Sequence, residues 1–274
     1  MAESHTVTNN SLLDGRVSLR QHAAGYRVSV DPVLLAASIP AKNSETILDV
    51  GAGVGAAMLC LAQRVDSARI IGVEIQRDLV HLASENISNN GFSKRLEIMI
   101  GDLQRPPPRL VPRSFDHVMA NPPYFEAGHV RESAKLEKVT SNIEGAGGLS
   151  AWINYCLSMV RPGGTVTIIH RTDRLVKLLT LLDGKVGDIV IFPIWPHHPF
   201  PFSDENAVIK EANENIKIPV NAKRVIVQAI SGTRGLLQLR SGIVLHNNDG
   251  HNTLKADAIL RHGKALNIRE ELIR

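Results

Sequence analysis

The tetrapeptide Asn121-Pro122-Pro123-Tyr124 combines residue types that could hold a planar amino group. It follows an apolar segment, 115–120, that is typical of a buried strand. Two consecutive prolines donate no backbone hydrogen bond and do not continue a central strand, so we expect a rigid corner with bare carbonyls. Asn121 adds an amide oxygen that accepts hydrogen bonds, and Tyr124 adds a flat ring for stacking. An ordinary proline-stiffened turn is the alternative, because turns favour Asn and Pro.

A glycine-rich loop between a short apolar strand, 47–50, and a helical segment, 56–65, predicts a nucleotide-binding doubly wound sheet. The loop is Gly51-Ala52-Gly53-Val54-Gly55. Its glycines would let backbone amides at the helix start approach an anionic group. With Ala56 in third place the loop also fits the dinucleotide pattern. A nicotinamide-dependent oxidoreductase therefore competes on this motif alone.

Polar side chains stand at the ends of four successive predicted strands. Asp49 lies at the end of the first strand, Glu74 ends the second, Asp102 follows the third, and Asn121 follows the fourth. In open α/β sheets, ligands bind along the edge where the parallel strands end. Glu74 lies about twenty residues past the glycine loop, where a carboxylate can hold two ribose hydroxyls. Asp49 could meet a ligand ammonium and Asp102 an adenine ring, which opposes the dinucleotide alternative.

The composition fits a single large α/β core. Of the 274 residues 43% are hydrophobic but only 4% are aromatic, so Val, Ile, Leu and Ala must build the interior. The net charge of +4 allows an anionic partner such as RNA. Cys60 and Cys156 lie in apolar helical patterns without a CxxC partner, so we expect buried thiols and no metal site.

The N-terminal region predicts an extension ahead of the main domain. Residues 1–13 are polar and aperiodic, which favours disorder, and 15–21 with 25–30 suggest a short hairpin. Asp31-Pro32 should begin a helix. The chain starts with no signal-peptide pattern and has no apolar run long enough for a membrane span, so we expect a cytoplasmic protein without a membrane partner.

These residues resemble the motif set of class I S-adenosylmethionine-dependent methyltransferases, and the tetrapeptide resembles that of members that methylate amino groups. Further matches are similar to the bacterial tRNA(Val) adenine-N6 methyltransferase family and its relatives. They are Gln21, Gly25-Tyr26-Arg27, Asp31-Pro32, Leu34-Leu35-Ala36-Ala37, Pro162-Gly163-Gly164, His170-Arg171 and Ala222-Lys223-Arg224-Val225. The stretch from about 200 to 219 looks like an insertion relative to that family.

The resemblance implies a Rossmann-like sheet of seven strands with the last strand antiparallel. Seven predicted strands begin near residues 47, 69, 95, 115, 165, 186 and 222, and residues 236–246 suggest a following hairpin. We expect residues 1–42 to form an extension packed on the core and residues 43–274 to form the methyltransferase domain.

The resemblance also implies a division of labour among the predicted site residues. S-adenosyl-L-methionine would be the cofactor, held by the strand-end residues Asp49, Gly51, Gly53, Gly55, Glu74, Asp102 and Asn121. Asn121 and the Pro122 carbonyl would accept the two hydrogens of an adenine amino group, with Pro123 stiffening the corner. Tyr124 would stack on the base, so replacement by Phe should be mild. No general base is required.

Several substrates and functions remain open from the residues. The same corner would suit a glutamine amide of a release factor or the guanine N2 of ribosomal RNA; a scaffold that binds cofactor without activity is a further alternative. The resemblance and the basic balance favour transfer RNA and its adenine N6. Candidate phosphate contacts are Arg27, Lys135, Lys138, Arg171, Lys223 and Arg224. The sequence gives no oligomeric state.

Overall fold

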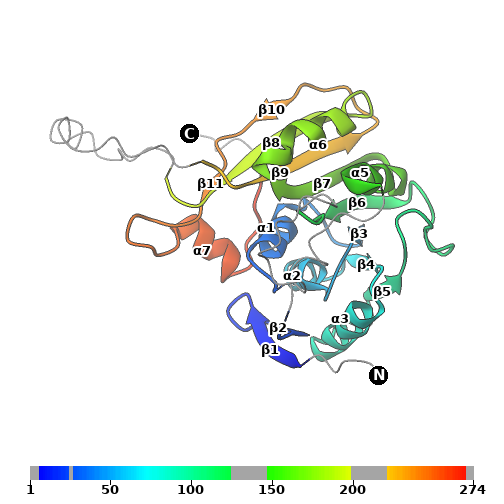
Figure 1. Cartoon of the computed structure of the whole chain (residues 1–274), viewed down its shortest axis with the longest axis vertical. Coiled ribbons are helices and arrows are strands. Elements are labelled where there is room, and N and C mark those ends of the chain that lie inside the picture. The colour runs from blue at the N-terminus through cyan, green and yellow to red at the C-terminus, as the bar shows by residue number, and fades with distance from the viewer. Residues whose placement is uncertain (1–5, 25–26, 125–146, 199–220, 270–274) are drawn as a thin grey trace, which may run out of the picture.

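A twisted β-sheet runs through the middle of the molecule with helices on both faces (Figure 1). The computed structural model describes residues 6–24, 27–124, 147–198 and 221–269. The seven long strands of the sheet are β3 (Thr46–Val50), β4 (Arg69–Glu74), β5 (Leu96–Ile100), β6 (Phe115–Ala120), β7 (Val160–Arg171), β8 (Val186–Trp195) and β9 (Arg224–Ser231).

The order of these strands confirms the predicted methyltransferase-like sheet. Across the sheet they follow one another as β8-β9-β7-β6-β3-β4-β5. Neighbours from β7 to β5 pair in parallel, whereas β9 pairs antiparallel with both β7 and β8. The last long strand is therefore inserted in reverse between two parallel strands. Its first residue consequently lies at the edge where its neighbours end.

The predicted hairpin over 236–246 is wrong. Two short strands, β10 (Gln238–Leu239) and β11 (Ile243–Val244), do not pair with each other but continue the sheet beyond β8. Both run parallel to β8, with Gln238 opposite Val190 and Ile243 opposite Ile194. The alternation of apolar residues marked extended structure correctly but did not identify its partner strand.

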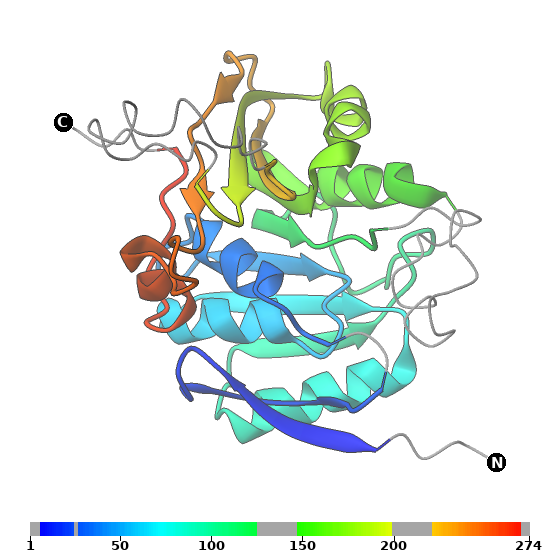
Figure 2. The ribbon, with the colours of Figure 1, turned by 60° about the vertical axis from the view of Figure 1, so that its left-hand side comes forward.

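Helices cover the two faces of the sheet in two layers (Figures 1 and 2). One layer holds α1 (Asp31–Ser38), α2 (Ala56–Arg64), α3 (Arg77–Asn89) and α7 (Leu254–Leu260). The other holds α5 (Gly148–Met159) and α6 (Leu175–Leu182), which follows the short 3-10 turn Thr172–Arg174. Successive residues of a strand point into the two cores in turn. Met119 packs in the core under the layer with α1 and α2, and Val118 packs in the core under α5 and α6. Among the described residues, no helix is both long and apolar enough to cross a membrane.

The N-terminal hairpin lies earlier in the chain than the sequence predicts. It pairs β1 (Val7–Leu12) with β2 (Val17–His22), so much of the segment expected to be disordered is a strand. Its inward side chains, such as Val17 and Leu19, are fully buried, while its other face is polar. One-sided burial explains why a polar composition did not exclude a strand here. Figure 2 shows the hairpin beside α3 at the margin of the molecule.

Candidate active site

The ends of β6, β3, β4 and β5 bring the predicted site residues to one edge of the sheet. These four strands are neighbours and parallel, with Val50 paired to Ala120 and Glu74 paired to Ile100. Asn121, the glycine loop, Glu74 and Asp102 therefore follow one another along that edge. The four polar strand ends of the sequence thus share one edge of the sheet.

Glu74 connects the end of β4 to the glycine loop. Its Oε2 accepts a 3.0 Å hydrogen bond from the Gly53 amide, and its Oε1 accepts one of 2.9 Å from the Gln76 amide. Burial raises the pKa of this carboxyl, since these backbone hydrogen bonds offset desolvation only in part. The amides of Gly51 and Ala52 both donate to the Val73 carbonyl. The loop amides thus have protein partners, and the expectation that they bind an anion is not supported for these three.

Asp49 is a buried carboxylate with an unsatisfied oxygen. The residue is 2% exposed, and its Oδ2 has no hydrogen-bond partner among the residues that the structure describes. Burial, together with the charge of Glu74, raises the pKa of Asp49 to about 7 despite a hydrogen bond from the Met58 backbone. A buried acceptor of this kind is costly unless a ligand supplies a donor. An ammonium group, such as the amino-acid end of S-adenosylmethionine carries, fits that requirement.

Trp152 of α5 lies directly against the glycine loop. A Cβ atom added at Gly51 would stand 2.2 Å from Trp152 Cη2, so only glycine permits this approach. Gly51 also has φ of +70°, a conformation that other residues rarely adopt. By contrast, a Cβ added at Gly53 would meet no atom within 4 Å. Gly51 therefore serves indole packing, a role that the glycine pattern did not reveal.

The corner at Asn121 is fastened to the N-terminal extension. The Tyr124 hydroxyl lies 3.0 Å from Asn121 Oδ1 and makes a short hydrogen bond to Asp31 Oδ2. Asp31 begins α1 and is 4% exposed. One hydroxyl thus joins the amide of the corner to a buried carboxylate from another part of the chain.

Arg224 completes this cluster from the reversed strand β9. Its Nε donates a 3.0 Å hydrogen bond to Asp31 Oδ2, and its guanidinium carbon stands 4.5 Å from the centre of the Tyr124 ring. The His170 ring lies 5.5 Å from the Tyr124 ring at a tilt of 58°. Tyr124 is therefore not the open stacking surface predicted from its type alone, because a cation already covers one side of the ring.

In the sequence, Asp31 marked a helix start, Arg224 was a candidate phosphate contact, and both lay in segments that resemble the tRNA(Val) methyltransferase family. Neither position was predicted to meet the tetrapeptide. A signal did exist for Arg224: an antiparallel strand brings its beginning, not its end, to the edge where parallel strands end. For Asp31 the sequence held no equivalent signal, because its contact spans 93 positions along the chain.

The other predicted phosphate contacts are dispersed. Arg171 pairs with Asp173, Arg27 Nη2 donates to Asn10, and Lys223 is exposed. Lys135 and Lys138 lie outside the described residues. Of the six, Arg171, Lys223 and Arg224 stand near the corner, since Arg171 is the pairing partner of Arg224 on β7.

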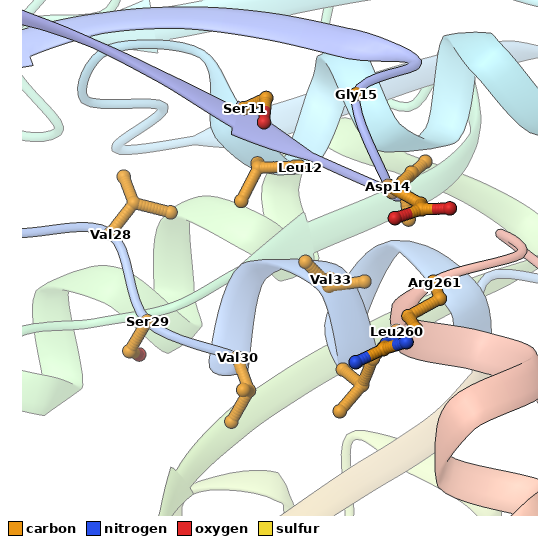
Figure 3. Close-up of a pocket in the computed structure, with 11 residues that line it drawn as sticks. Ser11, Leu12, Asp14, Gly15, Val28, Ser29, Val30, Val33, Leu260 and Arg261 are labelled. Carbon is orange, nitrogen blue, oxygen red and sulfur yellow. The ribbon is translucent and has the colours of Figure 1, made fainter.

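A separate open pocket of about 520 Å³ lies between the hairpin, the segment before α1, and α7 (Figure 3). Ser11, Leu12, Leu13, Asp14, Gly15, Val28, Ser29, Val30, Val33, Leu260 and Arg261 line it. None of the predicted site residues takes part in this pocket.

Part of the chain matches a known family model. Residues 27–146 match the family described as "Methyltransferase small domain". This match covers the glycine loop, Glu74, Asp102 and the tetrapeptide.

Curated relatives carry names that state a reaction. A "tRNA1(Val) (adenine(37)-N6)-methyltransferase" of Shewanella halifaxensis is 34% identical over 158 residues, 58% of this chain and 63% of that protein. A Haemophilus influenzae protein of the same name is 29% identical over 178 residues, 63% of this chain and 74% of that protein. The alignment therefore spans less than two thirds of the first relative.

Solved structures share the fold. A predicted O-methyltransferase from Agrobacterium tumefaciens superposes with a TM-score of 0.67 at 23% identity, covering 88% of this chain and all of that chain. A Thermotoga maritima SAM-dependent O-methyltransferase gives 0.51 at 18% identity, covering 77% of this chain and 68% of that one. The chain therefore shares the Rossmann-like fold of these proteins. Residues 27–146 are similar to the methyltransferase small domain.

Proposed function

We propose that this protein transfers a methyl group from S-adenosylmethionine to the N6 amino group of an adenine in transfer RNA. The observation that carries the proposal is the corner at the end of β6, which stands on the strand next to the glycine loop. An amino-group acceptor site beside a cofactor edge is what N-methyl transfer requires. The names of the curated relatives support adenine and transfer RNA as the substrate.

The strand-end residues would hold the cofactor. Asp49 would satisfy its unpartnered Oδ2 with the cofactor ammonium. Glu74, whose oxygens accept from the Gly53 and Gln76 amides, would also accept the ribose hydroxyls. Asp102, just after β5, would accept a hydrogen bond from the amino group of the cofactor's adenine. The cofactor supplies an activated methyl sulfonium, so the protein needs mainly to align the nucleophile.

The corner would activate the substrate amino group. The lone pair of an adenine amino nitrogen is delocalised into the ring, which makes the nitrogen a poor nucleophile. Two acceptors, Asn121 Oδ1 and the Pro122 carbonyl, would hold both hydrogens and turn the lone pair toward the methyl group. The same acceptors stabilise positive charge that grows on nitrogen in the transition state. A base within a duplex cannot reach such a corner, so the target must lie in a loop or be flipped out.

The experiment compares methyl transfer from labelled S-adenosylmethionine to separated pools of small RNA and protein, both from cells lacking this chain. The proposal expects label in small RNA, recovered as N6-methyladenosine after digestion, and none with Asn121→Ala. Label in protein would indicate glutamine methylation instead of RNA methylation. Label in guanine would indicate N2 methylation instead of adenine N6 methylation. Cofactor binding by Asn121→Ala, measured by calorimetry, shows that the variant remains folded.

A further inference from the structure

We propose that Asp31, acting through the Tyr124 hydroxyl, sets the orientation of the Asn121 side-chain amide and thereby aims Oδ1 at the substrate amino group. This inference rests on the proposed function for its catalytic consequence. It adds two positioning residues, Asp31 and Arg224, to the residues of the cofactor edge and the tetrapeptide.

The Tyr124 hydroxyl has fewer protons than acceptors around it. That oxygen contacts two acceptors, Asp31 Oδ2 and Asn121 Oδ1, but a hydroxyl carries one proton. Hydrogen bonds to a carboxylate are stronger than those to a neutral amide, so the proton goes to Asp31. The Tyr124 oxygen, which also interacts with the Arg224 guanidinium, then presents a lone pair to Asn121. Two oxygens 3.0 Å apart with no proton between them repel each other.

A half-turn of the Asn121 amide about its Cβ–Cγ bond removes this repulsion. The turn exchanges oxygen and nitrogen, which occupy nearly the same volume, so Nδ2 donates to the Tyr124 oxygen. Oδ1 then points away from Tyr124, free to accept a hydrogen from the substrate. The series runs from the Asp31 carboxylate to the Tyr124 hydroxyl and then to the Asn121 amide. Each group fixes the next, and the acceptor needed for catalysis is the last in the series.

Arg224 holds the first group of this series, the Asp31 carboxylate, in place. It hydrogen-bonds the same oxygen, Asp31 Oδ2, that receives the Tyr124 proton, and its guanidinium covers the Tyr124 ring. Asp31 is 4% exposed, and the Arg224 guanidinium is the cation that pairs with its buried carboxylate. The reversed strand β9 and the N-terminal helix α1 thus meet at the corner of β6.

The catalytic test is a double-mutant cycle on kcat with Tyr124→Phe, Asp31→Asn and both together. Tyr124→Phe removes one oxygen and keeps the ring, so its fold and its stacking should survive. We expect each single variant to lower kcat by roughly 10- to 100-fold with little change in cofactor affinity. The double variant should lose no more than the worse single, because both act through one amide. If the double variant loses kcat by the product of the two single losses, Asp31 and Tyr124 do not act through one amide and the inference fails. It also fails if Tyr124→Phe keeps full kcat.

Asp116→Asn provides the matched control. Asp116 also pairs with an arginine, Arg161, at 2.7 Å, but it lies at the other end of β6. The Asp116→Asn substitution should leave kcat unchanged. If it lowers kcat as much as Asp31→Asn does, loss of an acid–arginine pair anywhere on the strand would explain the result and the inference fails.

A second readout is independent of methyl transfer. In NMR spectra of the full chain, the Asn121 Nδ2 protons, assigned by their loss in Asn121→Ala, should be shifted and protected from solvent exchange. Tyr124→Phe should abolish both effects. Identical Asn121 amide signals in the two proteins would overturn the inference even if the enzyme is active. Conversely, a shifted Asn121 amide signal without RNA methylation would support the Asp31–Tyr124–Asn121 contacts and refute the proposed function.

Discussion

The Glu74 carboxylate is bound to the Gly53 amide at 3.0 Å, so the acid at the end of β4 and the loop after β3 form one unit. The bond places a negative charge beside the helix start where a dinucleotide site would hold pyrophosphate. It thereby favours a ligand that presents hydroxyls to this position. A ribose presents two.

Replacing Glu74 should therefore weaken cofactor binding more than replacing Asp102. Glu74→Ala removes both the ribose acceptor and the anchor of Gly53, and we expect the dissociation constant for S-adenosylmethionine to rise roughly 100-fold. Asp102→Ala should cost about 10-fold, because Asp102 is partly exposed and its Oδ1 already accepts from the Gln104 amide.

Isothermal titration of each variant measures the difference. Glu97→Ala is the control, since Glu97 lies within β5 and pairs with the exposed Arg109. If Glu74→Ala binds the cofactor as tightly as Glu97→Ala does, the ribose assignment is wrong.

Gly51→Ala and Gly53→Ala should separate steric cost from backbone cost. Both glycines have positive φ, which costs an alanine about 1 kcal/mol. Only at Gly51 would the new Cβ collide with Trp152, at 2.2 Å, which adds roughly 1–3 kcal/mol of overpacking. Urea unfolding should therefore rank Gly51→Ala as the less stable variant.

A pair of double variants tests the collision between Trp152 and a Cβ atom at position 51. Adding Trp152→Ala to Gly51→Ala should restore part of the lost unfolding free energy, whereas adding it to Gly53→Ala should only destabilise further. Equal behaviour of the two pairs would show that indole packing is not what requires glycine at position 51.

The sequence predicted the sheet well because its signals are local. The long strands contain apolar runs, and a polar residue at or just after the ends of β3, β4, β5 and β6 marks the binding edge. Trp152, Asp31 and Arg224 escaped prediction because their roles come from contacts between distant segments. The early strand β1 was missed for a related reason, since its burial depends on packing against the core rather than on its own polar composition.

Asp49 should make stability and cofactor binding depend on pH. Its pKa is raised to about 7 from an ordinary 3.8, so the folded state holds a proton that the unfolded state has lost between those values. Stability of the cofactor-free protein should therefore fall as pH rises from about 4 to about 7, by at most roughly 1.4 kcal/mol per pH unit, and then level off. Affinity for the cofactor ammonium should rise over the same range.

Comparison with Asp49→Asn isolates this effect. His170 acts in the opposite direction, because burial and the charge of Arg174 lower its pKa to about 4 and stability is lost as pH falls. The difference in unfolding free energy between wild type and Asp49→Asn cancels the His170 contribution. A difference that does not change between about pH 5 and about pH 8 would contradict a shifted Asp49.

Removing Arg224 should destabilise the protein far more than removing an arginine from an exposed pair. Arg224→Ala leaves the Asp31 carboxylate, with a side chain 6% exposed, without its cation, and we expect a loss of about 3 kcal/mol. Arg161→Ala breaks the more exposed pair with Asp116 and should cost less than about 1 kcal/mol. Urea unfolding at neutral pH measures both losses of stability.

Adding Asp31→Asn to Arg224→Ala removes the carboxylate that has lost its cation, so the double variant should be more stable than Arg224→Ala alone. If the second substitution instead lowers stability further, the buried charge is not the source of the loss, and Arg224 stabilises the corner mainly by packing on Tyr124.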